Sequence, residues 1–205
     1  LYPAFPYPDY THVTRADADA IYAYLQSLPP VAQPNRAHAL RFPYDTQLAL
    51  AAWRVLFFTP GRGDGAAADP ARDAQWNRGA YLVNGLAHCG ACHTPRNLLG
   101  ASQASRALGG GLIPGQNWYA PALDRASEAG VAHWPLDDVV ALLRTGVTRA
   151  ASATPAAAAT PQASVSGPMA EVVFRSTQYL SDEDARAMAV YLQALPERAA
   201  PPAPP

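Results

Sequence analysis

The chain has 205 residues, 49% of them hydrophobic, and a formal net charge of −1 at pH 7. This apolar content is sufficient for a packed core, and the near-neutral charge provides no basic surface for nucleic-acid binding. No apolar run reaches the ~20 residues of a membrane-spanning helix. The nearest candidate, residues 48–58, is short and contains Arg54. We therefore expect a globular protein without nucleic-acid partners.

Residues 14–30 predict the first helix, with Thr14 suited to the N-cap and Asp17 in the first turn. The same pattern returns in residues 181–196, and both segments end in Tyr-Leu-Gln-x-Leu-Pro. An internal repeat of this kind indicates two related structural units. We interpret residues 1–34 as a helical remnant that resembles the C-terminal part of a first domain.

Residues 35–72 form a predicted connector between this remnant and a complete domain over residues 73–198. Residues 60–72 are rich in Gly, Ala and Asp, a composition typical of a flexible linker. We expect the aromatic and apolar residues 48–58 to form a helix or turn that packs on the protein's own core or on a partner subunit. Insertion of their aromatic rings into a membrane interface is the less favoured alternative.

The complete domain opens with residues 74–86, whose apolar periodicity indicates an amphipathic helix. Gly79 lies inside this helix, where glycine costs stability unless it allows another element to approach closely. We expect the C-terminal helix to cross there, near Val190, Tyr191 and Ala194.

The next residues, Cys89-Gly-Ala-Cys92-His93, contain both cysteines of the chain. A C-x-x-C-H pattern is typical of covalent haem attachment, because one helical turn presents two thiols to the haem vinyl groups and the histidine binds the iron. A zinc site is a weaker alternative, since structural zinc usually takes two separated ligand pairs. A redox-active pair would need a βαβ setting, and a disulfide across two residues would be strained. The pattern therefore predicts one covalent haem c.

The remaining predicted elements are a turn-rich segment with Gly109–Gly111, a helix over residues 136–145, a flexible insertion over residues 150–167, a short helix over residues 167–174, a helix over residues 182–195 and a Pro-rich tail over residues 199–205. Gly146 is a natural stop for the helix before it. The insertion has almost no large apolar side chains, so we expect it to be exposed and mobile.

The haem face opposite His93 needs a second ligand if the protein only transfers electrons. Of the two methionines, Met188 has the spacing of a core residue in the last helix. Met169 follows Gly-Pro ahead of a helix, where a loop can cross the far haem face, and we favour it as the distal ligand. The other histidines are expected at the surface or in ordinary hydrogen bonds: His12, His38, His88 and His133.

Three stretches resemble the cytochrome c subunits of bacterial membrane-associated dehydrogenases. They are residues 79–97 around the C-x-x-C-H motif, residues 167–173 (Gly-Pro-Met-Ala-Glu-Val-Val) and residues 178–184 (Gln-Tyr-Leu-Ser-Asp-Glu-Asp). The likeness is strongest to the middle domain of the three-haem type, and residues 1–7 are similar to the close of that family's first domain. The resemblance implies an all-α, class I cytochrome c-like domain of about four helices around one covalent haem.

Carried over residue by residue, the resemblance assigns haem-attachment or iron-ligand roles to Cys89, Cys92, His93 and Met169. It also implies that the carbonyl of Pro121 accepts the proton of the His93 imidazole and so orients that ring. Arg96 and Trp118 are implied to hold a haem propionate. The loop over residues 150–167 departs from the family pattern and is interpreted as an insertion.

These observations predict one-electron transfer from the catalytic subunit of a periplasmic dehydrogenase to a quinone site, another haem or a soluble acceptor. The chain itself would not be an enzyme, and it would lie in the periplasm, at the outer face of the inner membrane. The alternative is a haem enzyme or gas sensor in which Met169 dissociates from the iron. Because the chain begins with Leu1 and has one haem motif, we expect a processed polypeptide or a piece of a multi-haem protein.

Overall fold

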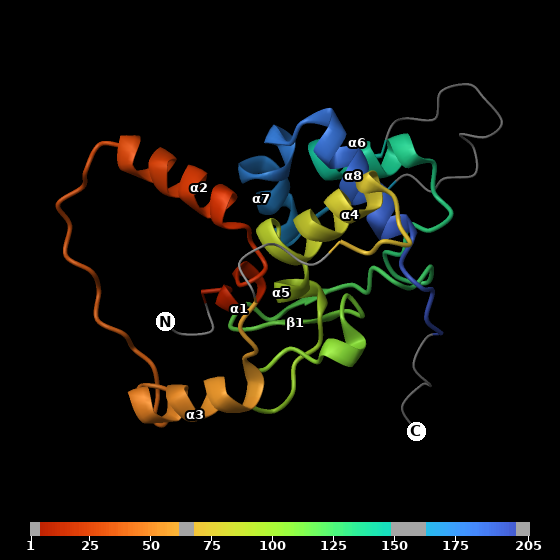
Figure 1. Ribbon diagram of the computed structural model, residues 1–205. Helices are drawn as coiled ribbons and strands as arrows, with labels where there is room; N and C mark the ends of the chain where they lie inside the picture. Colours follow the sequence, from red (N-terminus) through yellow and green to blue (C-terminus); the bar gives the residue numbers. More distant parts are fainter. Residues whose placement is uncertain (1–4, 62–67, 149–162, 200–205) are drawn as a thin grey trace. The chain divides into compact units, whose positions relative to one another are not determined.

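The computed structural model describes residues 5–61, 68–148 and 163–199 (Figure 1). The chain divides into two compact units, Leu1–Ala67 and Ala68–Pro205. The described parts of both units are mostly helical, and the second also contains a short antiparallel pair of strands. The prediction of a helical protein is confirmed at this level, and the strands are an addition within the segment that was expected to consist of turns.

The first unit contains α1 (Tyr7–Tyr10), α2 (Arg15–Ser27) and α3 (Gln47–Phe57). The expected N-cap of α2 is confirmed, because the Thr14 hydroxyl accepts a hydrogen bond from the Asp17 N–H at 3.1 Å. Every residue of α2 is at least partly exposed. A helix with this sequence pattern therefore forms from local signals even where its apolar face is left open.

The aromatic segment that was expected to be a helix or turn forms α3. Leu50 is its buried residue, whereas Leu48 and Val55 are 82% and 85% exposed. The Thr46 hydroxyl caps the helix by accepting a hydrogen bond from the Ala49 N–H at 3.3 Å. Leu50 is thus buried, and α3 leaves other apolar side chains exposed.

The described part of the second unit contains α4 (Ala74–Tyr81), a π-helical turn (Leu82–Leu86), α5 (Gly90–His93), β1 (Gly111–Ile113), β2 (Trp118–Ala120), α6 (Leu136–Thr145), α7 (Gly167–Arg175) and α8 (Asp182–Gln193), with short 3₁₀ turns at Ala104–Arg106 and Thr177–Tyr179. Figure 1 shows α8 crossing α4, and α8 also contacts α6. β1 and β2 form an antiparallel pair in which Leu112 lies opposite Tyr119. The helices expected after the haem motif are confirmed, with α6 ending at Gly146 in the left-handed conformation.

Gly79 lies where α4 packs closely against α8. A Cβ atom added at Gly79 would lie 2.0 Å from the Ala187 carbonyl oxygen and 2.8 Å from Tyr191 Cβ. The expected crossing of the two helices is therefore confirmed, and Tyr191 is correctly placed in it. The atoms nearest to this position belong to Ala187 and Tyr191, which lie one turn apart on the same face of α8 because residues i and i+4 share a helix face.

We expect Gly79→Ala to lower the free energy of unfolding by about 1–3 kcal/mol, because the new methyl group would push α8 away from α4. Helix propensity alone predicts the opposite sign, since alanine favours a helix by about 1 kcal/mol over glycine. Chemical denaturation followed by circular dichroism separates the two effects. A more stable variant would show that the helices have room for a side chain at this crossing.

The core of the second unit lies among the π-helical turn, α6 and α8. Val83 and Met188 are 0% and 1% exposed, and they belong to a cluster completed by Leu82, Leu108, Val131, Val139, Leu143, Ala189 and Leu192. The expectation that Met188 is a packing residue is confirmed. Because its thioether is enclosed by other apolar side chains, it is not available to bind a metal in this fold.

Most of the predicted insertion, and the Pro-rich tail from residue 200, lie outside the described residues. Thr148 is paired with Ala163, which lies within the predicted insertion: the Thr148 N–H donates to the Ala163 carbonyl at 2.9 Å, and the Ala163 N–H donates to the Thr148 hydroxyl at 3.0 Å. This pairing brings the chain back beside the end of α6 before α7 begins. Among the described helices, none has the length and apolar character needed to cross a membrane.

Candidate cofactor site

The C-x-x-C-H motif forms a single helical turn at α5. Cys89 is the N-cap residue, and the His93 N–H donates to the Cys89 carbonyl at 2.9 Å. Cys89 and Cys92 are three residues apart, so the turn places their side chains on the same face. Both are half-buried. The motif therefore offers two neighbouring thiols and one imidazole from a short, hydrogen-bonded segment.

A π-helical turn leads into this motif where a continuous α-helix was expected. The Ala87 N–H donates to the Leu82 carbonyl at 2.8 Å, which is the wide spacing of a π-helix. His88 follows with φ of 40°, in the left-handed region that non-glycine residues seldom adopt. The Cys89 N–H then donates a hydrogen bond to the Val83 carbonyl at 3.0 Å. These contacts tie the start of α5 to the core residue Val83.

The structure brings His93 together with Pro121, which lies 28 residues away in the sequence. His93 Nδ1 is 2.7 Å from the Pro121 carbonyl oxygen, so Nδ1 carries the proton and donates it to that carbonyl. This tautomer leaves Nε2 with a lone pair that can bind a metal. Burial lowers the pKa of His93, and the hydrogen bond to Pro121 opposes this effect only in part. The ring is therefore neutral at pH 7, as a metal ligand must be.

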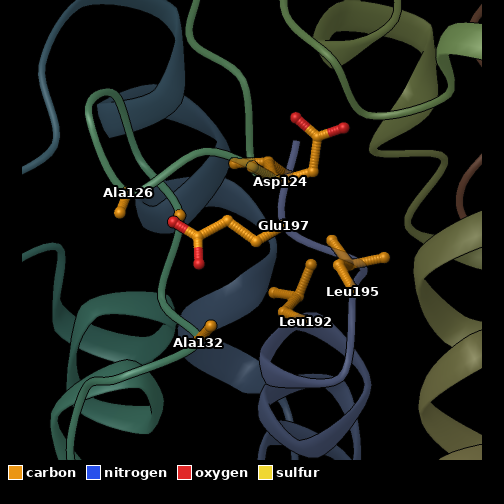
Figure 2. A pocket seen from close by; sticks show the side chains of 8 residues that line it. Asp124, Ala126, Ala132, Leu192, Leu195 and Glu197 are labelled. Carbon is orange, nitrogen blue, oxygen red and sulfur yellow. The ribbon is translucent and has the colours of Figure 1, made fainter. Parts of the chain in front are cut away.

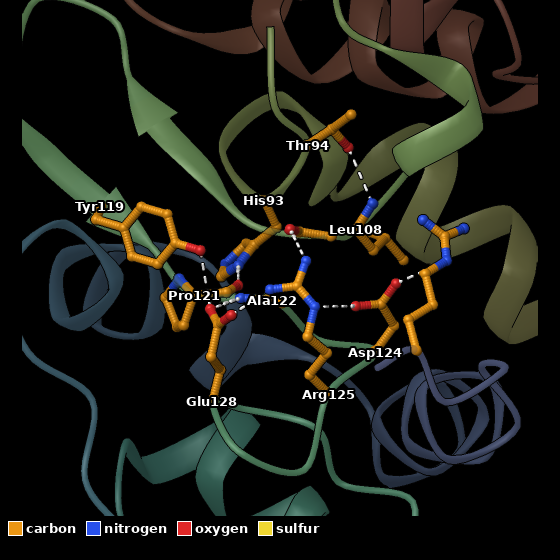
Figure 3. Close-up of polar contacts among 11 residues, drawn as sticks. His93, Thr94, Leu108, Tyr119, Pro121, Ala122, Asp124, Arg125 and Glu128 are labelled. Atoms are coloured by element: carbon orange, nitrogen blue, oxygen red, sulfur yellow. Dashed lines mark hydrogen bonds and ion pairs between the residues drawn. The ribbon is translucent and has the colours of Figure 1, made fainter. Parts of the chain in front are cut away.

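The peptide between Pro121 and Ala122 is held from its other side by Glu128 (Figure 3). The Ala122 N–H donates to Glu128 Oε2 at 2.7 Å, and the Tyr119 hydroxyl donates to the same oxygen at 2.9 Å. Arg125 donates to the other carboxylate oxygen. Burial alone would raise the pKa of Glu128, but the hydrogen bonds from Ala122 and Tyr119, together with Arg125, outweigh burial and lower it.

Arg125 connects this carboxylate to the glycine-rich segment. It is 6% exposed, and its Nη2 donates to the Gly109 carbonyl at 2.8 Å. The Gly110 N–H in turn donates to the His93 carbonyl at 2.8 Å. Gly110 has φ of 80°, and a Cβ atom there would lie 2.4 Å from the Tyr119 hydroxyl oxygen. Glycine is therefore required for the segment to lie between His93 and Tyr119.

Sequence reasoning missed the polar cluster formed by Tyr119, Asp124, Arg125 and Glu128. The sequence signal for this cluster was the pair of opposite charges at Arg125 and Glu128, three residues apart and just after residues 120–123 (Ala-Pro-Ala-Leu). That signal carries little information by itself, because most such pairs are exposed and weak.

Because the pKa of Glu128 is lowered in the folded protein, its ionised form contributes stability above the pKa of the unfolded chain. This contribution is lost as the pH falls through the folded-state value. We expect Glu128→Gln to be less stable than the wild type at pH 7 and to approach it in stability under acidic conditions. Urea denaturation of both proteins across this pH range checks the prediction. A difference in unfolding free energy that does not change with pH would contradict it.

Arg96 is anchored to the backbone around α5. Its guanidinium donates to the Ala91 carbonyl at 2.9 Å and to the Gly100 carbonyl at 2.8 Å. Its Nε is buried and has no hydrogen-bond partner within the part of the chain that the structure describes. Arg96 therefore retains one donor N–H beside the motif, which an added carboxylate could satisfy.

The Trp118 indole packs against Gly167, the first residue of α7. A Cβ atom added at Gly167 would lie 2.7 Å from the Trp118 ring. Gly167 has φ of 53°, and Pro168 follows in the first helical turn, as is common at helix starts. Met169 is the next residue and is half-buried. Of the two methionines, it is the one that the core does not enclose.

The expectations for the remaining histidines are confirmed. His12 and His38 are exposed, and the side chain of His133 is 78% exposed. His88 Nδ1 lies 3.1 Å from the Leu86 carbonyl oxygen, which is an ordinary backbone hydrogen bond. Within residues 5–61, 68–148 and 163–199, no group of three or more His, Cys, Asp and Glu side chains is placed to hold a metal ion.

Two cavities lie near these residues. Figure 2 shows the first, about 10 Å³ in volume, beside Asp124 and the end of α8, which is space for at most one water molecule. The second, about 380 Å³, is lined in part by the glycine-rich segment. It is lined by Pro95, Arg96, Arg106, Gly109, Gly110, Gly111, Leu112, Tyr119, Arg125 and Glu128. The larger cavity thus borders the segment that packs against the motif.

The donor set fits a covalently attached haem. Two thiols share one helical turn, and a neutral imidazole has its Nδ1 occupied. One buried donor of Arg96 lacks a partner among the described residues. The two thiols suit covalent attachment to the porphyrin, and the imidazole suits ligation of its iron. These features together supply attachment, ligation and a polar contact.

Comparison with known proteins identifies relatives over almost the whole chain. A subunit of the nicotinate dehydrogenase of Pseudomonas putida is 41% identical over 196 residues, covering 95% of this chain and 15% of that protein. The cytochrome c subunit of the quinone alcohol dehydrogenase of Gluconacetobacter polyoxogenes is 38% identical, covering 96% of this chain and 40% of that protein. The fructose dehydrogenase cytochrome subunit of Gluconobacter japonicus is also 38% identical, covering 97% of this chain and 38% of that protein.

The chain therefore spans less than half the length of these curated relatives. No family model matches it. At 38% identity over nearly the whole chain, it is homologous to cytochrome c subunits of dehydrogenases.

Proposed function

We propose that the second unit is a c-type cytochrome domain that carries one covalently attached haem and transfers single electrons. The observation that carries this proposal is the arrangement at α5, where the turn that presents Cys89 and Cys92 also directs His93 Nδ1 onto Pro121. When bound, haem supplies the one-electron couple between ferrous and ferric iron. The homology to cytochrome c subunits supports the same function.

On the proximal side, Cys89 and Cys92 form the thioether bonds and His93 binds iron through Nε2. Pro121 fixes the ring orientation, because its carbonyl accepts the Nδ1 proton at 2.7 Å. A ligand held in this way is a stronger donor and cannot rotate away from the iron. These residues attach and orient the cofactor, and none of them acts on a substrate.

On the opposite side, we propose Met169 as the second iron ligand and Arg96 and Trp118 as contacts of a haem propionate. The half-buried position of Met169 in the first turn of α7 supports its role. The buried Nε of Arg96 has no hydrogen-bond partner among the described residues, which supports a contact with a carboxylate. The support for Trp118 is indirect: its ring covers Gly167, two residues before Met169.

The chain is an electron-transfer component and not a catalytic subunit, in line with the names of its relatives. We propose that its electron donor is the catalytic subunit of a dehydrogenase and that its acceptor is a quinone site, a further haem or a soluble protein. We propose a periplasmic location, at the outer face of the inner membrane, which the proposed covalent haem and dehydrogenase partner support. The three-haem organisation is proposed from the sequence resemblance, with one haem bound by this chain.

The direct test is intact mass and absorption of the protein purified from a host that attaches c-type haem. The expected result is a mass increase of one haem and an absorption band that persists after denaturation in acid, because thioether bonds survive unfolding. A protein without that band, or one that releases its haem on denaturation, would contradict the proposal. Metal analysis of the same sample reports stoichiometric zinc if the zinc alternative holds instead.

A further inference from the structure

We propose that Glu128 is a positioning residue that acts through the Pro121–Ala122 peptide to strengthen the hydrogen bond from His93 and to lower the reduction potential of the haem. This inference rests on the proposed function, because it concerns an iron bound by His93. It adds a residue outside the ligand set that adjusts how strongly the imidazole donates to the metal.

The geometric basis is a single peptide unit held at both ends. The carbonyl of Pro121 and the N–H of Ala122 belong to the same planar, resonance-stabilised amide. His93 Nδ1 lies 2.7 Å from the carbonyl oxygen, and the N–H donates to Glu128 Oε2 at 2.7 Å. Figure 3 shows the imidazole and the carboxylate at opposite ends of this peptide. The carboxylate is therefore linked to the imidazole through one amide group.

The electronic consequence follows from amide resonance. A hydrogen bond to an ionised acceptor is roughly twice as strong as one between neutral groups, and hydrogen bonds in a chain polarise one another. A carboxylate on the Ala122 N–H draws the amide proton and shifts electron density toward the Pro121 oxygen. That oxygen becomes a better acceptor for the His93 proton. A more strongly hydrogen-bonded imidazole is a more basic ligand, which favours ferric iron.

Glu128 is held in place for this role. Its side chain is 24% exposed, Tyr119 donates to the same oxygen at 2.9 Å, and Arg125 donates to the other oxygen. Arg125 is fixed in turn by the Gly109 carbonyl at 2.8 Å, and the adjacent Gly110 N–H is bonded to the His93 carbonyl at 2.8 Å. A closed set of hydrogen bonds thus runs from the His93 backbone around to the His93 ring. The carboxylate cannot leave the Ala122 N–H without breaking this set.

Asp124 provides a matched control for the charge alone. It is buried, and its Oδ1 lies 3.9 Å from Arg125 Nε, so it faces the same cation as Glu128. Its Oδ2 lies 3.1 Å from Arg198 Nε, and neither carboxylate oxygen accepts a hydrogen bond within the described residues. Asp124→Asn therefore removes a neighbouring negative charge while leaving the Pro121–Ala122 peptide in contact with Glu128.

The test compares Glu128→Gln and Asp124→Asn in the haem-loaded full chain at pH 7. The two readouts are the reduction potential and the ¹H NMR shift of the His93 Nδ1–H in the diamagnetic ferrous protein. For Glu128→Gln we expect the equilibrium constant for reduction to rise three- to tenfold, at most about 59 mV for one electron, and the proton signal to move upfield. For Asp124→Asn we expect the Nδ1–H signal to stay in place.

An unchanged Nδ1–H signal in Glu128→Gln would overturn the proposal, and so would equal movement of that signal in both variants. Tyr119→Phe tests the same carboxylate if Glu128→Gln does not fold. Tyr119 is 52% exposed, and its loss removes one competing donor, so the signal should move downfield and the potential should fall. No change in either readout would again overturn the inference. A wild-type protein without covalent haem would instead refute the proposed function.

Discussion

The double substitution Cys89→Ser, Cys92→Ser is expected to leave the chain with no covalently bound haem. The two thiols lie on the one turn of α5, and serine differs from cysteine only in replacing sulfur by oxygen. The local structure is therefore expected to be kept. Covalent attachment is lost, because a hydroxyl does not add to a haem vinyl group under conditions in which a thiol does. Absorption of the acid-denatured protein and its intact mass measure the outcome directly.

The single substitutions serve as controls for this experiment. Cys89→Ser and Cys92→Ser each retain one thiol, and we expect each to yield at most one thioether bond, visible as a red-shifted band of the reduced haem. Circular dichroism shows whether each variant keeps the helical content of the wild type. Persistence of covalent haem in the double variant would contradict the assignment of both cysteines.

Met169→Ala is expected to abolish the near-infrared absorption of the iron–thioether bond in the ferric protein and to open the ferrous iron to carbon monoxide. The side chain is half-buried at the start of α7 and is separated from the core that encloses the other methionine. Removing it leaves the sixth position to water or to an external ligand. The measurements are the ferric near-infrared spectrum and the spectrum of the reduced protein under carbon monoxide, which we expect to change from no binding to one molecule per haem.

Met188→Leu is the matched control, because Met188 is 1% exposed in the core and leucine conserves its volume. Such exchanges usually cost less than about 1.5 kcal/mol of stability, so the protein should stay folded with its near-infrared band intact. A band that survives Met169→Ala would contradict the ligand assignment. Carbon monoxide binding by the wild-type reduced protein would favour a haem enzyme or gas sensor over an electron carrier.

The helices were predictable where their signals are local. Thr14 and Ser181 each accept a hydrogen bond from the N–H three residues ahead, and the sequence pattern places both at a helix start. Gly146 ends α6 in the left-handed conformation that glycine adopts without strain. Gly79 predicted a close approach of two helices. The identity of the contacting residue, Ala187, depends on the register of α8 relative to α4, which no local sequence pattern determines.

The short strands and the π-helical turn were not predicted, for a related reason. β1 and β2 have three residues each, and they lie in a segment whose glycines indicate turns. The π-turn at Leu82–Leu86 has the apolar content of the helix that it extends. Its wider hydrogen-bond spacing is stabilised by the hydrogen bond that the Cys89 N–H donates to the Val83 carbonyl. This contact forms with the folded core.

Residue type and spacing alone were sufficient to identify Cys89, Cys92 and His93 as one chemical unit, because all three lie within a single helical turn whose geometry is the same wherever it occurs. Tertiary structure decided what surrounds that unit. Pro121 is 28 residues from His93. Glu128 is linked to the His93 ring through the Pro121–Ala122 amide, from whose N–H it accepts a hydrogen bond. Helical periodicity determines the relative positions of residues a few places apart in the chain. The contacts with Pro121 and Glu128 depend instead on packing, which brings distant backbone groups together, and on directional hydrogen bonds formed where water is excluded.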